Sequence, residues 1–144
     1  MEKTKTPWHL WLVGGLAVLW NAFGAVDYVL TEATPQTYLR SMGLNDAQIA
    51  YTVALPDWMV AVWAIGVWAG LTAAIHLLVK RRWAVPLFAG SFVAILVSIV
   101  YQHVLTDSSA VMGPTAWTAS VVVASSCAAF LAYSWVMKRR GILR

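Results

Sequence analysis

Four long apolar stretches constrain what this chain can fold into more than any other feature of its sequence. They run from Trp8 to Leu30, from Asp57 to Val79, from Trp83 to Leu105 and from Pro114 to Met137, and each is 23 or 24 residues long. A helix needs about 20 mostly apolar residues to cross the hydrocarbon core of a bilayer. We therefore predict an all-α membrane protein, a bundle of four transmembrane helices that forms a single integral membrane domain over residues 1–144.

The composition supports this class. Of 144 residues, 60% are hydrophobic and 11% are charged, whereas soluble domains carry about 25% charged residues. The few residues outside the four stretches leave no room for a soluble domain. The single cysteine, Cys127, excludes an intramolecular disulfide and a thiolate metal cluster, and we interpret it as a small buried hydrophobic residue.

The charges predict an orientation. Only Arg40 among the basic residues falls between the first and second stretches. Five of the six acids lie at or beyond the membrane face on which that connection would lie: Asp27, Glu32, Asp46, Asp57 and Asp107. The other nine basic residues flank the stretches at the opposite ends: Lys3, Lys5, Lys80, Arg81, Arg82, Lys138, Arg139, Arg140 and Arg144. This positive-inside pattern predicts both termini in the cytoplasm and a multi-pass membrane protein.

The basic residues could also indicate a nucleic-acid partner or a signal peptide, and we reject both interpretations. The formal net charge of +4 is divided among three short flanks, which suits anionic lipid headgroups, and we exclude nucleic acid as a partner. Lys3 and Lys5 resemble the positive start of a signal peptide. The apolar run continues well past Gly24, so we predict that the first span is not cleaved.

The longest connection, residues 31–55, predicts two short helices and therefore a helical lid between helices 1 and 2. Their apolar sides would lie on the bundle, and a plain interfacial helix pair without a gating role is the open alternative. The capping residues are Thr34, Pro35 and Gly43 for the first helix, and Asn45 with Gln48, in a capping-box spacing, for the second.

Small residues predict where helices approach closely, because close packing in lipid relies on them. The second span carries Gly66, Gly70 and Ala74, and the fourth carries Ala116, Ser120, Ala124, Ala128 and Ala132 at fourfold spacing. The sequence leaves open whether each stripe meets a helix of this chain or of another subunit.

Polar side chains within the spans are functional candidates by default, because they are costly in a bilayer. Helical spacing places Asn21, Gly24 and Tyr28 on one stripe of the first span, and Trp20 with Asp27 on the adjoining stripe. Ser91, Ser98 and Gln102 form a stripe on the third span, and Thr118 and Ser125 form one on the fourth. If these stripes converge, they form a polar site open to the outer face; hydrogen bonds that merely hold the bundle together are the alternative. The candidate ligand-binding residues are Trp20, Asn21, Asp27, Tyr28, Trp63, Ser98 and Gln102.

Other ionisable residues give weaker signals. His103 and Asp107 are four residues apart and would share a helix face. They would complete a metal site with Asp27 and Asp57, although no zinc-type spacing supports one. His9 and His76 lie near the inner face and could present an axial pair to a haem, although lone histidines at membrane ends are usually interfacial. No nucleophile–base pair, P-loop or dinucleotide motif occurs in the sequence, and no cofactor is identified.

Several short motifs carry a resemblance to a known family. They are Trp20-Asn21-x-x-Gly24, Thr34-Pro35 with Tyr38, Tyr51 with Pro56-x-Trp58, and the run from Arg81 to Phe88 with Tyr101 further on. With these motifs the chain resembles small four-span bacterial inner-membrane proteins that are commonly labelled "sugar transporter". The resemblance covers most of the chain. It implies solute transport and a place in the inner membrane of a bacterium.

Three functions follow as hypotheses. The first is a transporter or binder of a small solute, in which Asn21 and Gln102 orient the solute and Asp27 couples a proton. The second is an accessory or structural subunit of a larger membrane complex. The third is a quinone- or haem-binding oxidoreductase component. Beyond the lipid bilayer, the expected partners are a small solute and either further copies of this chain or a larger complex.

Overall fold

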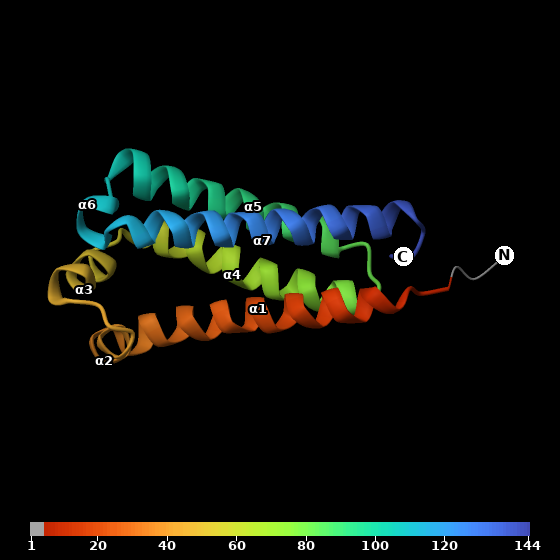
Figure 1. Ribbon diagram of the computed structural model, residues 1–144, viewed down its shortest axis with the longest axis horizontal. Coiled ribbons are helices and arrows are strands. Elements are labelled where there is room, and N and C mark those ends of the chain that lie inside the picture. Colours follow the sequence, from red (N-terminus) through yellow and green to blue (C-terminus); the bar gives the residue numbers. More distant parts are fainter. Residues whose placement is uncertain (1–4) are drawn as a thin grey trace.

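The computed structural model describes residues 5–144, and all regular structure in this part of the chain is helical (Figure 1). Lys3 lies outside the described residues. Four helical segments are long and apolar enough to cross a membrane, so the prediction of an all-α chain with four helices of membrane-spanning length is confirmed. The elements are α1 (Trp8–Ala33), α2 (Pro35–Ser41), α3 (Asp46–Val53), α4 (Asp57–Leu78), α5 (Ala84–Val100), the π-helix η1 (Tyr101–Leu105), α6 (Ser109–Met112) and α7 (Pro114–Arg139).

Helix α1 continues past Leu30 and ends at Ala33. Pro35 sets this end, because a proline disfavours the helical conformation of the residue before it, and Thr34 accordingly has φ −141° and ψ 55°. The Thr34 hydroxyl donates back to the Leu30 carbonyl (3.2 Å) and makes no capping bond to α2. Thr34 is therefore the N-cap residue of α2, as predicted, but its side chain does not make a capping hydrogen bond.

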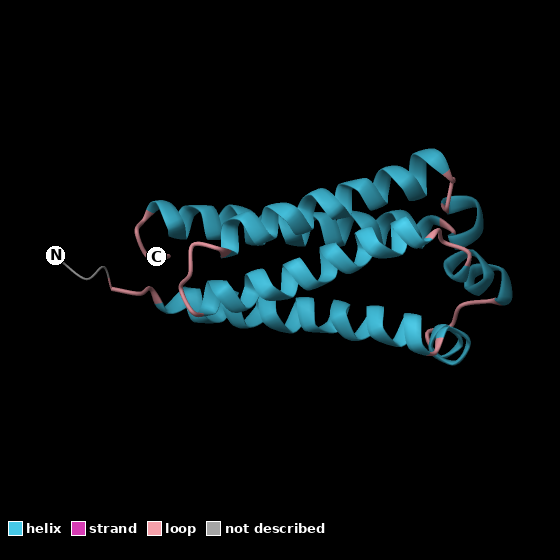
Figure 2. Ribbon diagram, turned by 180° about the vertical axis from the view of Figure 1, so that it is seen from behind, coloured by secondary structure: helices cyan, strands magenta, loops and turns pink. Residues whose placement is uncertain are grey.

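The long helices pack in the order α1, α4, α5, α7, each chiefly against the next. The short link from Val79 to Trp83 makes α4 and α5 antiparallel neighbours, as its length predicts. The helices lie close together where α1 begins and α7 ends. They fan apart toward the end that carries α2, α3 and α6 (Figures 1 and 2).

We call the narrow end the basic end, because every lysine and arginine of residues 5–144 except Arg40 lies there. Backbone hydrogen bonds join the segment after α7 to the α4–α5 link: Arg144 N–H donates to Lys80 O (2.8 Å), and Arg82 N–H donates to Arg144 O (2.9 Å). Ile142 and Leu143 are buried beneath this pairing. The Lys80 ammonium also reaches the Thr6 hydroxyl (3.4 Å), so three separate segments are tied together at this end.

The buried core is concentrated in the half of the bundle nearer the basic end, around Leu10, Leu77, Phe88 and Met137. Many large apolar side chains cover the outside of the bundle; Leu19, for example, is 70% exposed. An apolar exterior around a small core is what a bilayer-embedded bundle requires, since lipid tails solvate apolar side chains as well as the core does.

We call the wide end the distal end. There the Asn45–Gln48 capping box is confirmed, with both of its hydrogen bonds at 3.0 Å. Helix α2 packs on α1, and α3 packs on α6. The Tyr51 hydroxyl is 2.9 Å from the Thr106 hydroxyl, and the Gln48 amide donates to Val111 O (3.4 Å). Helices α2 and α3 therefore bridge the distal end from α1 to α6.

Candidate functional site

Polar side chains from α1 and α5 converge on one glycine of α4. A Cβ atom added to Gly70 would collide with Asn21 Oδ1 and would lie 3.1 Å from Ser91 Oγ. The Asn21 amide donates to Ala17 O (2.8 Å), and the Ser91 hydroxyl donates to Gly66 O (2.6 Å). Only a residue without a side chain allows this approach, so Gly70 is what brings Asn21 and Ser91 together.

The fourth span joins the same cluster through Cys127. Its sulfur lies 3.7 Å from Phe88 O and 3.9 Å from Ser91 Oγ, and the side chain is buried, as predicted. A Cβ atom on Gly66 would meet Ala94 of α5 at 3.4 Å. The small stripe of the second span therefore packs on helices of this same chain. We call Asn21, Gly66, Gly70, Ser91 and Cys127 the Gly70 cluster.

Asp27 lies closer to the distal end of α1 than Asn21 does, and it is hydrogen-bonded to a residue of α2. The Tyr38 hydroxyl donates to Asp27 Oδ1 (2.8 Å). This hydrogen bond, together with partial burial and the carboxylate charge, raises the pKa of Tyr38 above its ordinary value. The one ion pair among residues 5–144 is the surface pair Arg40–Asp46, so Asp27 is partnered by a phenol and not by a cation.

Two more predicted residues form an aromatic contact. Tyr28 of α1 and Trp63 of α4 meet edge to face with their ring centroids 5.0 Å apart. Such pairs contribute about 0.5–1.5 kcal/mol beyond their buried area, so this contact helps to hold α1 against α4. Trp20, in contrast, is 42% exposed on the outside of the bundle.

The remaining polar stripes do not join a common axis. The Ser98 hydroxyl donates to Ala94 O of its own helix (3.0 Å). Gln102 is half-buried, and its backbone carbonyl accepts a hydrogen bond from Ser108 N–H (2.6 Å). Thr118 and Ser125 are exposed on α7. The structure thus brings together Asn21 with Ser91, Asp27 with Tyr38, and Tyr28 with Trp63, in three separate places.

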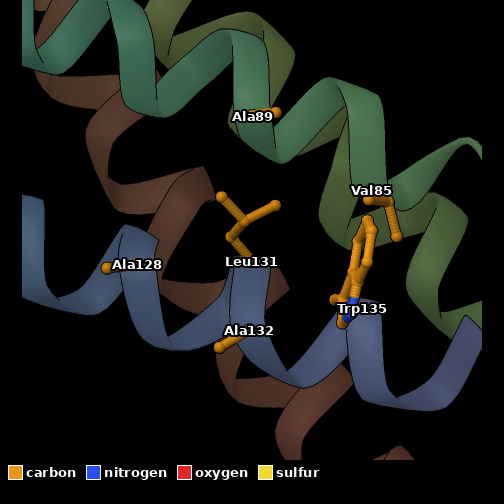
Figure 3. A pocket seen from close by; sticks show the side chains of 6 residues that line it. All are labelled: Val85, Ala89, Ala128, Leu131, Ala132 and Trp135. Carbon is orange, nitrogen blue, oxygen red and sulfur yellow. The ribbon is translucent and has the colours of Figure 1, made fainter. Parts of the chain in front are cut away.

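Two surface grooves have almost wholly apolar linings. One, of about 430 Å³, lies between α5 and α7 near the basic end (Figure 3). The other, of about 300 Å³, is lined by Trp58, Tyr101 and aliphatic residues of α5 and η1. Neither groove includes Asn21 or Asp27.

Sequence reasoning missed two histidine contacts. His9 Nδ1 and the Tyr133 hydroxyl are 2.6 Å apart, which links α1 to α7 near the basic end. His103, in η1, lies 3.0 Å from the Ser120 hydroxyl and 3.4 Å from the Ser108 hydroxyl, and its ring meets Trp117 edge to face. The fourfold-spaced small stripe of α7, which includes Ser120, was the available signal for the His103 contact.

The prediction that His103 shares a helix face with Asp107 is wrong. The helix ends at Leu105, and Asp107 has a left-handed backbone with φ 44°. Residues 5–144 contain no group of three or more His, Cys, Asp or Glu side chains that could hold a metal ion. His76 Nδ1 is bonded to Thr72 O (2.8 Å) and His9 to Tyr133, so the two histidines considered as a haem pair have separate partners.

No protein-family model, curated protein or solved structure matches this chain. The proposals that follow therefore depend on the geometry described above.

Proposed function

We propose that this protein binds a small polar solute at its distal end and serves as a small transporter or solute-binding protein of a bacterial inner membrane. The observation that carries the proposal is the bond between Asp27 and Tyr38. An ionisable side chain within a membrane-spanning helix is costly and marks a solute or ion pathway by default. A phenol is a neutral partner that a solute hydroxyl can replace.

The surroundings of Asp27 suit a hydroxylated solute such as a monosaccharide. A carboxylate accepts hydrogen bonds from hydroxyl groups, and solute sites combine a few such polar groups with aromatic walls. Tyr28 follows Asp27 in α1 and contacts Trp63, which supplies the aromatic surface. The resemblance to proteins labelled "sugar transporter" agrees with this chemistry.

In this proposal α2 and α3 act as a lid. Tyr38 keeps α2 on α1 through Asp27, while Tyr51 and Gln48 keep α3 on the opposite side of the distal end. Exchange of the Tyr38 hydroxyl for a solute hydroxyl at Asp27 would release α2. Asn21 and Ser91 lie deeper in the bundle and would receive the solute after Asp27.

The test is uptake or binding by the full chain reconstituted in proteoliposomes, with a panel of labelled monosaccharides as probes. Asp27→Asn should abolish uptake, and Tyr38→Phe should change it. Asp46→Asn, which removes an acid from the surface ion pair, is the matched control and should leave uptake unchanged. Uptake that is indifferent to both Asp27→Asn and Asn21→Ala would refute the proposal.

A structural subunit of a larger membrane complex is the second candidate. The observation that favours it is that the polar side chains of the Gly70 cluster are bonded within the bundle, and no buried side-chain nitrogen or oxygen of residues 5–144 lacks a partner. Groups used this way hold helices together and need no solute. Migration of the solubilised protein as an isolated small oligomer on a native gel would count against this candidate.

A further inference from the structure

The groove between α5 and α7 is built from small side chains on both of its walls. Ala89 lies on α5, and Ala128 and Ala132 lie on α7. Figure 3 shows Leu131 pointing into the space between the two helices and Trp135 reaching across to Val85, which closes the groove toward the basic end. The result is an open apolar groove that runs along the helices and ends at the indole of Trp135.

The lining restricts the occupant. Its walls expose almost no polar surface, and water does not occupy sites without polar partners. Ligand sites of this size are usually apolar with a few polar groups at one place that fix orientation. A groove parallel to membrane-spanning helices suits a hydrocarbon chain, which lies in the same direction.

Positive charges stand where the headgroup of such a lipid would lie. On the α7 wall, the Lys138 ammonium sits 6.0 Å from the centre of the Trp135 ring. On the α5 wall, Arg82 lies two residues before the helix begins at Ala84, and its carbonyl accepts a hydrogen bond from Val85 N–H (3.3 Å). The acids of residues 5–144 all lie elsewhere, on residues 27–57 or at Asp107. The charge at this end of the groove is therefore complementary to a phosphate.

We propose that this groove binds one anionic phospholipid, with an acyl chain between α5 and α7 and the phosphate at Lys138 and Arg82. Basic sites between membrane helices recognise anionic headgroups in this way. The indole of Trp135 would lie at the level of the headgroup, as interfacial tryptophans do. The site is separate from the proposed solute site and does not depend on it.

The test is native mass spectrometry of the full chain, purified in detergent and supplied with phosphatidylglycerol or with phosphatidylcholine of the same acyl chains. Wild type should retain one phosphatidylglycerol in preference to phosphatidylcholine. Ala132→Leu, which fills the groove, should lose that lipid. Ala129→Leu is the matched control, because Ala129 is also exposed on α7 but does not line the groove.

A second pair of variants tests the headgroup. Lys138→Gln should lower the preference for phosphatidylglycerol about fivefold, since one basic residue near a membrane surface contributes that much to anionic-lipid binding. Lys5→Gln removes a lysine of the basic end from the stretch before α1 and should leave the preference unchanged. Ala89→Leu fills the groove from the α5 wall and should repeat the loss if Ala132→Leu disturbs the helix.

Three results would overturn the proposal. The first is equal retention of phosphatidylglycerol by the Ala132→Leu, Ala89→Leu and Ala129→Leu proteins. The second is equal retention of the two lipids by wild type. The third comes from a measurement of the melting temperature with each additive. If inorganic phosphate alone raises the melting temperature as much as phosphatidylglycerol does, the groove is not the binding site, because phosphate does not fill it.

Discussion

At Gly70, side chains of two neighbouring helices approach α4 closely. Asn21 and Ser91 approach it from α1 and α5, and both side chains keep hydrogen bonds to backbone carbonyls while they do so. A side chain at this position would separate the helices and strain those bonds. The contact explains why a polar residue near the middle of α1 is tolerated within the membrane.

Gly70→Ala should therefore lower the free energy of unfolding by about 1–3 kcal/mol, the usual cost of overpacking a tight interior. Gly90→Ala is the control, because a Cβ atom at Gly90 meets nothing within 4 Å. Helix propensity alone would make that change neutral or slightly stabilising. Unfolding in mixed sodium dodecyl sulfate micelles measures both. Equal effects of the two substitutions would contradict the close approach.

The Tyr38–Asp27 bond predicts a dependence on pH. The bond raises the pKa of Tyr38 in the folded chain, whereas a tyrosine in the unfolded chain has a pKa of about 10. The folded chain therefore keeps the phenol protonated at a pH where the unfolded chain loses the proton. The stability from this bond is complete below pH ~10 and is lost as the pH rises through the folded-state pKa. Wild type and Tyr38→Phe should thus converge in stability at high pH.

Asp27→Asn should move the pKa of Tyr38 down toward the ordinary value. Ultraviolet titration of each protein, with the curve of its Tyr38→Phe derivative subtracted, isolates this one phenol. Asp46→Asn should leave the titration as it is in wild type. An unchanged pKa in Asp27→Asn would show that the carboxylate is not the cause of the shift.

At the scale of the element, the π-helix η1 adds a polar contact to α7 beyond the direct packing of α5 on α7. Five residues in π geometry, 101–105, turn His103 toward Ser120 and Ser108. Thr106 closes the turn, since its N–H and hydroxyl both donate to Tyr101 O. Short π-helices often occur at functional sites, and here the π-helix supplies a hydrogen bond between the third and fourth spans through His103 and Ser120.

Ser120→Ala should cost about 0.6 kcal/mol of stability, the average for a hydrogen bond between membrane helices. Ser125→Ala changes an exposed serine of the same helix and should cost nothing measurable. The same micelle unfolding assay compares them. A loss in Ser125→Ala as large as that in Ser120→Ala would dismiss the contact with His103.

The elements also show what a sequence can reveal in advance. The spans and the Asn45–Gln48 capping box depend on residues that are near one another in the chain, so local patterns predict them. The stripe of Gly66 and Gly70 predicts a close approach, but it cannot say that Asn21 and Ser91 are the side chains that fill it. The prediction that His103 and Asp107 share a face relied on α-helical spacing. It fails because the helix changes to π geometry at Tyr101 and ends at Leu105.

At the scale of the whole molecule, all described basic residues except Arg40 gather at one end, and α2, α3 and α6 lie at the other. We predict that the basic end is cytoplasmic. In a Cys127→Ala background, Arg81→Cys should react with a membrane-impermeant maleimide only after cells are opened, and Gln36→Cys should react in intact cells. The reverse pattern would overturn this orientation and the side from which the proposed solute enters.

The fan-like spread of the helices has a mechanical consequence. A body that is narrow at one end and broad at the other displaces unequal areas in the two leaflets of a bilayer (Figure 2). Lateral pressure in the leaflet around α2 and α3 therefore pushes against the spread, whereas the leaflet around the basic end meets segments already tied by Lys80, Arg82 and Arg144. Membrane tension and headgroup crowding would thus act on the spread of the helices chiefly through the leaflet around α2 and α3.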